Sequence, residues 1–588
     1  MVNGATPSFL FPNPPIIHLV PEFQACPSCK TRLHVLKTSV KTVVTLDIGA
    51  FRAKETELFC PNDQKVFISE QLRRLTPAGC VFGYDVMVEV GLALFIRCRN
   101  NQEIMDELAA RNVYVSEREI SYLGSKFIIY LSLSHRDSQE SLREMMGRNG
   151  GYILHVDGTC EGNSPNLFCG IDGISELVLD AIKIPSEKKD QLIPFFQRIK
   201  QQYGKPRALV HDMGKGILAA IEEVFAGLPD FICHFHFLRD IGKDLLLDEY
   251  TAMTKRLRKL KVRPTLRQKA KYFESKISFT PEMVDKVTAS LESGTWQTAS
   301  FEHIPLITAY VLIQWVFDYP RQSNGYGFPF DRPQLDFYRR LQTAHLLLGE
   351  IMDVHLRSIV GDNRPFVQIH KALKEAVEDK RLNALATTLE RKAEVFDKLR
   401  TAMRLALPES KNGLNDNGDD AEIKTIEENV IAFRTWLIGG KRRTSTYAKM
   451  LTQLDKYWEK LFADPLPVVT ADGLVYIQPQ RTNNLLERFF RAEKQRSRKK
   501  SGTASLNKVL KAILAKTPLV QNLNNHEYYK IILNGCPDLA RRFSQIDEHL
   551  VQKEMKSAKK NTEKIMPVIR KVIKGSGLTT KISALFSE

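Results

Sequence analysis

The strongest constraint on the fold is the stretch between residues 151 and 235, where short apolar segments alternate with amphipathic ones. Short apolar runs between turn residues predict strands, and longer runs with apolar residues three or four apart predict helices. We therefore predict, in chain order, strand 151–157, strand 166–171, strand 176–184, helix 188–203, strand 207–210, helix 215–225 and strand 231–235. Three consecutive strands followed by alternating helices and strands predict an α/β domain.

Acidic residues stand at the ends of two of these strands and at the start of a later helix. Asp157 and Asp212 each close an apolar run, and Glu487 opens a helical pattern. Each Asp also has a simpler explanation, because Asp157 precedes Gly158 as in an ordinary turn and Asp212 could cap the following helix. Two-metal phosphoryl transfer, however, needs several carboxylates on rigid elements to hold two divalent cations. The three residues together therefore favour such a site.

Two further motifs lie downstream. Cys233 and His236 form a Cys-x2-His spacing around the last predicted strand, and Asn483 and Asn484 stand directly ahead of Leu-Leu-Glu487. With these motifs the chain resembles DDE transposases with an RNase H-like catalytic core, most closely the Mutator-like group and its bacterial insertion-sequence relatives. The resemblance extends over roughly residues 150 to 515.

The resemblance implies that Asp157, Asp212 and Glu487 bind two Mg²⁺ or Mn²⁺ ions and carry the chemistry. Asp172 also ends a short strand, but in the RNase H-like order the first essential carboxylate lies on the first strand, which favours Asp157. His236 ranks fourth and could contact a phosphate near the scissile bond. A Cys-His pair without a second pair of ligands is weak evidence for a metal site. Alternatives to metal binding are that the motif shapes the active-site wall or that Cys233 has a buried structural role.

The function implied by the resemblance is that of a DNA transposase, which binds terminal inverted repeats, cleaves DNA strands with metal ions and transfers them to target DNA. Its partners would be double-stranded DNA and further copies of the chain, in a homodimer or a larger synaptic complex. Two alternatives remain. One is a domesticated, non-catalytic DNA-binding protein derived from a transposase, and the other is a different RNase H-like nuclease.

The basic residues concentrate around the third carboxylate. The chain has a net charge of +17, and residues 481–516 contain eleven Lys or Arg against two Glu. Such a charge run can be a solvated face, or it can neutralise DNA phosphates. Arg491, Lys494 and Arg498 follow Glu487 at helical spacing, so they share its face. The DNA-contacting residues predicted on this helix are Arg488, Arg491, Lys494, Arg498, Lys499 and Lys500.

A second candidate metal site lies near the start of the chain. Cys26-Pro-Ser-Cys29 and Cys60-Pro-Asn-Asp63 flank a Thr- and Val-rich stretch that predicts strands. Two such turns facing each other make a zinc ribbon, because thiolates on paired tight turns can close a tetrahedral Zn²⁺ site. The fourth position holds Asp63 instead of Cys, and His34 could take its place. A collapsed ribbon without metal is the alternative.

Residues 101–123 predict a helix-turn-helix. An apolar-periodic helix over 101–112 is followed by a turn with Val113 and Val115 buried. Ser116 then caps a second helix with Glu119 at the capping-box position. In the family that the chain resembles, such a module would hold the transposon end, although helix hairpins also occur as plain structure. The residues predicted to face DNA are Arg118, Ser121 and Tyr122.

The expected fold class is an α/β RNase H-like catalytic core interrupted by a large all-α insertion, with N-terminal zinc-ribbon-like and helix-turn-helix modules, multi-domain α+β overall. The predicted segments are a zinc-ribbon-like domain 1–75, a helix-turn-helix DNA-binding domain 76–145, the first part of the catalytic core 146–240, the helical insertion 241–472, the last part of the core 473–520 with the Glu-bearing basic helix, and a basic helical C-terminal tail 521–588. A polar break at 409–420 predicts a loop inside the insertion.

Hydropathy gives an expectation for the compartment. No window approaches the roughly 18 uncharged apolar residues of a membrane span, and no basic segment precedes the first apolar residues. We therefore expect no membrane partner and an intracellular, DNA-associated protein, in the cytoplasm or nucleoid if bacterial. The nine Cys are then ligands or core residues and not a disulfide framework.

Overall fold

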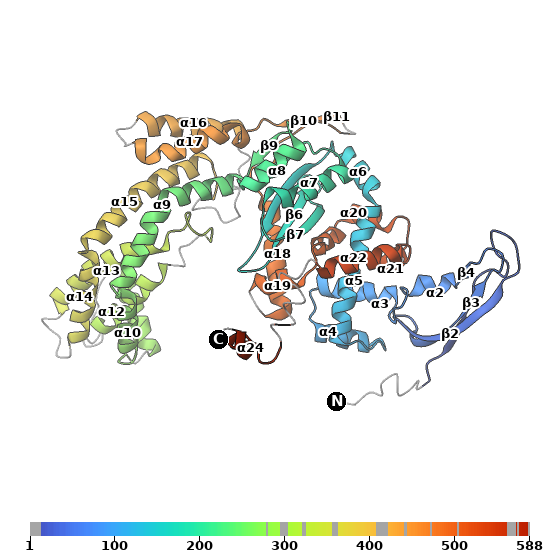
Figure 1. Ribbon diagram of the computed structural model, residues 1–588. Helices are drawn as coiled ribbons and strands as arrows, with labels where there is room; N and C mark the ends of the chain where they lie inside the picture. Colours follow the sequence, from blue (N-terminus) through green and yellow to red (C-terminus); the bar gives the residue numbers. More distant parts are fainter. Residues whose placement is uncertain are drawn as a thin grey trace. The chain divides into compact units, whose positions relative to one another are not determined.

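The computed structural model describes residues 13–277, 280–293, 304–319, 325–355, 363–406, 422–439, 444–470, 473–502, 505–560, 572 and 575–585. They form two compact units, each described by itself below (Figure 1). The first unit comprises Met1–Phe231 and Pro465–Glu588, and the second comprises Ile232–Asp464. Both helices and strands are present, with helices in the majority.

An N-terminal sheet opens the first unit. Its strands are β1 (Ile16–Leu19), β2 (His34–Thr45), β3 (Gly49–Phe59) and β4 (Val66–Phe67). β3 is central, since it pairs antiparallel with β2 and β4 and parallel with β1. The strands predicted from the Thr- and Val-rich stretch are therefore confirmed, and β2 and β3 form the long antiparallel hairpin labelled in Figure 1.

Helices connect this sheet to the next one. They are α2 (Glu70–Leu75), α3 (Tyr84–Phe95), α4 (Asn101–Ala109), α5 (Glu117–Asp137) and α6 (Gln139–Arg148). The predicted turn after α4 is confirmed: Val113 and Val115 are buried, and Ser116 and Glu119 form a reciprocal capping box at the start of α5. Because this cap satisfies otherwise unpaired N–H groups, it fixes where α5 begins.

The central sheet has the strand order β7-β6-β5-β8-β9. Its elements are β5 (Ile153–Thr159), β6 (Asn166–Asp172), β7 (Val178–Ile184), α7 (Lys189–Tyr203), β8 (Ala208–His211), α8 (Lys215–Phe225) and β9 (Asp230–Ile232). β5, β6 and β7 are antiparallel neighbours, and β8 runs parallel to β5. This matches the predicted element order, with each strand shifted by at most two residues except the last.

The prediction for the last strand was wrong in its extent. β9 ends at Ile232, and the α-helix α9 (His234–Lys259) begins where the strand was predicted to continue. The run Phe231 to Leu238 is apolar and aromatic enough to suggest a strand. However, Phe237, Leu238, Ile241 and Leu245 are buried at helical spacing, and this longer period decides the local structure.

After the second unit, the chain returns to the first unit through a hairpin. β10 (Leu466–Thr470) and β11 (Gly473–Ile477) pair antiparallel, where the sequence had suggested helix up to 472. Helices follow: α18 (Asn484–Ser501), α19 (Leu506–Ala512), the 3₁₀ helix η2 (Thr517–Asn524), α20 (His526–Leu533), α21 (Leu539–Phe543), α22 (Glu548–Lys560) and α24 (Leu578–Leu585).

One continuous apolar core joins α3 to α6, the central sheet and the C-terminal helices. On its outer edge, the Asn522 side chain accepts from the N–H of Val178 and donates to its carbonyl, both at 2.8 Å, much as a neighbouring strand would. The buried His135 ring on α5 contacts the Tyr528 hydroxyl at 2.9 Å. Residues predicted as a helix-turn-helix module and as a tail thus share the core of the sheet.

The second unit consists of helices in the described part of the chain. They are α9, α10 (Val262–Glu274), α11 (Pro281–Ser293), α12 (Ile304–Phe317), α13 (Pro333–His355), α14 (Arg364–Val377), α15 (Lys380–Ala402), α16 (Ile423–Gly439) and α17 (Thr444–Leu461). α9 packs along α15, where the Lys392 ammonium lies 2.6 Å from Glu249 Oε1. The predicted loop 409–420 lies outside the described residues. Within the described ranges, no helix has both the length and the hydropathy needed to cross a membrane.

Candidate functional site

The first predicted carboxylate, Asp157, lies on the central strand of the five-stranded sheet. On β5, Leu154 and Val156 are fully buried, and Asp157 is only 7% exposed. The Oδ1 atom of Asp157 accepts the backbone N–H of Gly158 at 2.7 Å. A single backbone donor compensates little of the free-energy cost of burying a charged carboxylate.

The second carboxylate occupies the equivalent position on the neighbouring strand. β8 runs parallel to β5, and the last pair in their register is His155 and Val210. Asp157 and Asp212 each follow their partner by two residues, at the carboxyl ends of adjacent strands. Asp212 is half-buried, and its Oδ1 accepts the N–H of Gly214 at 3.1 Å. The register therefore brings the two carboxylates to the same edge of the sheet.

The third carboxylate is held to the same strand by the residue that precedes its helix. Asn483 is fully buried at the N-terminus of α18. Its Nδ2 donates to the carbonyl of Val156 at 3.0 Å, and its Oδ1 lies 3.2 Å from Nδ1 of His155. These bonds fasten the first turn of α18 to the residues just before Asp157. Glu487 lies in that first turn.

The pKa of Asp157 is affected by the other two predicted carboxylates. Burial raises the pKa of Asp157 well above its usual value, and the negative charges of Asp212, Glu487 and Glu187 raise it further. The hydrogen bond from Gly158 acts in the opposite direction but does not offset them. Within the described residues, no Lys or Arg forms an ion pair with Asp157, Asp212 or Glu187. Asp157 therefore lies in a predominantly acidic environment.

Glu187 was not predicted as a member of this cluster. It lies in the connection between β7 and α7, where its Oε1 accepts from Nδ2 of Asn166 at 2.5 Å. Burial raises the pKa of Glu187, the charge of Asp212 raises it further, and the bond from Asn166 lowers it. No apolar period or motif surrounds Glu187 in the sequence, so only the three-dimensional packing identifies it.

The competing first carboxylate, Asp172, serves a different purpose. It is fully buried, and its two oxygens accept from the N–H groups of Ile153, Ile174 and Ser175 and from the Ser175 hydroxyl. Four donors satisfy this carboxylate, so it closes a turn. This satisfied environment supports the preference for Asp157.

His236, the fourth predicted catalytic residue, lies in the first turn of α9 in the second unit. It is 6% exposed, and its ring packs near that of Phe235. Cys233 directly precedes α9 and is also buried. A contact of His236 with a phosphate stays a prediction, as does any role for the Cys-His pair.

The basic residues of α18 divide into an exposed set and a packed set. Exposed side chains, without a partner among the described residues, are those of Arg491, Lys494, Arg498 and Lys499. Arg488 is exposed and pairs with Glu176 at 3.4 Å. Lys500 instead lies over the Phe95 ring at 5.0 Å, and burial lowers its pKa. Lys500 is therefore half-buried against Phe95, and the other five side chains are exposed.

The residues predicted to face DNA on α5 lie on its exposed first turns. Arg118, Ser121 and Tyr122 are exposed there, and the Ser121 hydroxyl donates to the carbonyl of Glu117 at 3.0 Å. The Tyr122 ring lies 5.6 Å from the Lys126 ammonium. These three side chains are accessible, and their contact with DNA stays a prediction.

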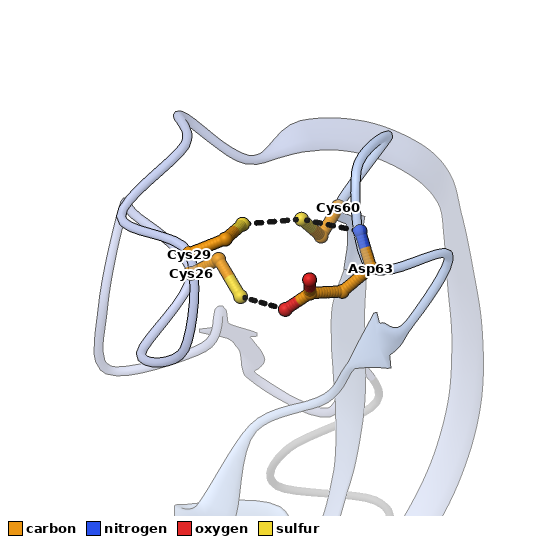
Figure 2. A group of neighbouring side chains, drawn as sticks. All are labelled: Cys26, Cys29, Cys60 and Asp63. Atoms are coloured by element: carbon orange, nitrogen blue, oxygen red, sulfur yellow. Dashed lines mark hydrogen bonds between the residues drawn. The ribbon is translucent and has the colours of Figure 1, made fainter.

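The four predicted ligands of the N-terminal site come together. Figure 2 shows Cys26 and Cys29 facing Cys60 and Asp63. One atom from each residue lies within 4.8 Å of the other three, with Cys26 Sγ 3.0 Å from Asp63 Oδ2 and the Cys29 and Cys60 sulfurs 3.4 Å apart. Ligand atoms of tetrahedral zinc lie about 3.8 Å apart, so small adjustments admit an ion. His34 is exposed on β2 and is not part of this group.

The two turns that carry these ligands have the same backbone design. The residue after each second ligand, Lys30 and Gln64, has a positive φ of 58° and 51°. In each turn the N–H of the first Cys donates to a carbonyl five residues on, from Cys26 to Thr31 and from Cys60 to Lys65. The N–H of Asp63 also points at the sulfur of Cys60, 3.4 Å away. The two turns therefore share the same hydrogen-bonding pattern.

The pKa values of the Cys26 and Cys29 thiols are shifted in opposite directions. Thr31 faces the sulfur of Cys29 and lowers the pKa of that thiol. At Cys26 the N–H of Cys29 lowers the pKa, but burial and the adjacent Asp63 raise it overall. Because thiols bind zinc as thiolates, metal binding at this cluster would release protons from the Cys side chains. This cluster can hold a metal ion such as Zn²⁺.

The sequence matches no protein-family model, and no curated protein matches it either.

Proposed function

We propose that the chain is a DNA transposase that cleaves and joins DNA strands with divalent cations at Asp157, Asp212 and Glu487, on an RNase H-like core. Three features support the proposal together: the strand order of the central sheet, the convergence of the carboxylates and the basic surface of α18. The observation that carries it is the convergence, because Asp212 and Glu487, which lie 55 and 330 residues after Asp157 in sequence, both raise the pKa of that residue.

The topology supports the RNase H-like assignment. Three antiparallel strands, β5 to β7, are followed by a helix, a strand parallel to β5, another helix and a last short strand. The first carboxylate lies on β5, the second directly after β8, and the third on a helix that follows a separate helical unit. In open sheets with helical crossovers, functional groups gather outside the carboxyl ends of the strands.

The donor set fits Mg²⁺ or Mn²⁺. Hard divalent cations prefer carboxylate and carbonyl oxygens as ligands. Asp157 and Asp212 would hold the ions from the sheet, and Glu487 would hold them from α18. When bound, the ions activate the attacking oxygen and neutralise charge on the leaving oxygen. Asn483 keeps Glu487 in place through its two bonds to β5.

The exposed basic side chains of α18 can contact successive phosphates of a DNA strand that leads away from the carboxylates. Glu487 and Arg498 lie eleven residues apart on one rigid helix, a distance of about 16 Å. This is about five nucleotides of one strand along the axis of B-DNA. Arg491 and Lys494 lie between them and can contact phosphates without reading sequence.

A strand-cleavage assay tests the proposal. Purified protein is incubated with a labelled duplex covering the terminal repeat and flank of its own genomic locus, with and without Mg²⁺, and cuts are mapped on each strand. The proposal predicts metal-dependent cuts at the repeat boundary that disappear in Glu487→Gln. Glu222→Gln, an exposed residue on α8, is the matched control and should leave cleavage unchanged.

The two alternative functions give different outcomes in the same assay. Binding of the repeat without cleavage, with every metal and DNA form, favours a non-catalytic DNA-binding protein. Metal-dependent cleavage of branched DNA or RNA–DNA hybrids, with no preference for the repeat boundary, favours another RNase H-like nuclease. Cleavage retained in Glu487→Gln contradicts the assigned carboxylate.

A further inference from the structure

Glu187 is built into the carboxylate cluster by the packing of two glycines. A methyl group on Gly158, the residue after Asp157, would overlap both Glu187 Oε1 and Asn166 Oδ1. A methyl group on Gly216, in the first turn of α8, would overlap the backbone carbonyl of Glu187. One glycine thus leaves room for the side chain of Glu187 and the other for its backbone. The connection between β7 and α7 is therefore held close to Asp157, at the carboxyl end of β5.

Asn166 presents an unsatisfied oxygen at the same place. It is the first residue of β6 and is 9% exposed. Its Nδ2 donates to Glu187, which fixes the orientation of the amide, and no described residue donates to its Oδ1. A buried acceptor without a donor costs about 1 to 3 kcal/mol. A cation would satisfy it, because amide oxygens bind divalent cations in proteins.

From this geometry we infer that Glu187 and the Asn166 Oδ1 atom supply ligands for a second cation position beside Asp157, shared with Asp212. The position would take Mg²⁺ or Mn²⁺. Glu187 is then a fourth carboxylate of the site, contributed by the β7–α7 connection, and Asn166 holds it and adds a neutral oxygen. The inference rests on the proposed function for its role in strand cleavage, but the cation position itself stands on contacts among Glu187, Asn166 and Gly158.

Counting bound Mn²⁺ tests the inference without relying on catalysis. The full-length protein is first loaded with Zn²⁺, so that the Cys26 cluster does not contribute, and Mn²⁺ binding is titrated by electron paramagnetic resonance. The wild-type chain should bind two Mn²⁺ ions, and Glu187→Gln should bind one. Gly158→Ala keeps every carboxylate but displaces Glu187, so it should also bind one. Glu222→Gln should still bind two.

The outcomes separate this inference from the proposed function. Two bound ions in Glu187→Gln, or a single ion in the wild-type chain, would overturn the second cation position. A lower unfolding temperature of Glu187→Gln with an unchanged ion count would assign Glu187 a structural role only, and would also overturn it. Loss of one ion in a chain that cleaves no DNA would uphold the cation position and reject the proposed function. Normal cleavage by Glu187→Gln with two bound ions would uphold the proposed function and reject the cation position.

Discussion

Replacing Asp157 by Asn should stabilise the metal-free protein. Asn keeps the size of the side chain and the oxygen that accepts from Gly158 at 2.7 Å, but it carries no charge. Asp157 and Asp212 stand at equivalent places in the register of β5 and β8. Neighbouring strands are about 4.8 Å apart. Two unit charges at that distance repel by about 3 kcal/mol at an effective dielectric constant of about 20. Because the cluster can bind a proton to relieve part of this repulsion, we expect a gain of about 1 to 3 kcal/mol.

The gain should depend on pH in a defined direction. The pKa of Asp157 is raised in the folded protein, so the folded state binds the proton more tightly than the unfolded state. The stability associated with this proton is fully present below the unfolded pKa of about 4 and is lost as the pH rises through the folded pKa. Asp157→Asn removes that loss. Its advantage over the wild-type chain should therefore grow from pH 5 to pH 8.

Urea unfolding in EDTA at both pH values measures the effect, with Glu222→Gln as a control that should not change stability. Adding Mg²⁺ should stabilise the wild-type chain, because an ion that binds only the folded state raises its stability. Asp157→Asn should gain little from Mg²⁺. An Asp157→Asn protein that is less stable than wild type in EDTA at pH 8, or equally favoured at both pH values, would refute the reasoning.

Three further predictions follow from the described contacts. Asn483→Ala leaves His155 Nδ1 and the Val156 carbonyl buried without their partner, so the free energy of unfolding should fall by about 2 to 4 kcal/mol in urea titrations; a loss below about 0.5 kcal/mol would contradict the assigned bonds. Cys60→Ser should abolish stoichiometric Zn²⁺ binding, measured by elemental analysis. A chelator should lower the unfolding temperature of the wild-type chain but not that of the variant. Equal zinc content in both proteins would rule out the cluster as the zinc site. Replacing both Arg491 and Lys494 by Ala should lower the salt dependence of DNA binding by about two phosphate contacts, measured by fluorescence anisotropy over a range of KCl, and an unchanged slope would show that α18 does not contact the backbone.

The strands and their carboxylates could be predicted because the determining pattern is local. β5, β6, β7 and β8 are short apolar runs that end at turn residues, and Asp157 and Asp212 stand at their ends. The same holds for the Cys-Pro turns, whose spacing places Cys26 and Cys29 on one tight loop. In each case a few consecutive residues determine the geometry.

Other features depend on contacts that no local pattern records. Glu187 reaches the cluster only because Gly158 and Gly216 leave space for it, and these residues are far from one another in sequence. Lys500 and Arg498 have the same helical context, yet Lys500 packs on Phe95, which the chain contributes some 400 residues earlier. Distinguishing a phosphate-binding cation from a packed one requires the fold.

The extent of α5 shows a third kind of difference. Its capping box was visible in the sequence, but the helix extends to Asp137 and is buried along most of its length. From Phe127 to Leu133 apolar residues occur on every side of the helix, which indicates burial and not a surface module. The sequence identifies where α5 begins, whereas the C-terminal helices that cover it determine how much of it is exposed.

Anomalous diffraction from crystals of the full chain soaked in Mn²⁺ tests the central claim most directly. We expect anomalous density in contact with the carboxylates of Asp157 and Asp212, and its loss in crystals of Asp157→Asn. Manganese bound only at other acidic surfaces, with no density beside Asp157, would contradict the claim that these carboxylates form a catalytic metal site.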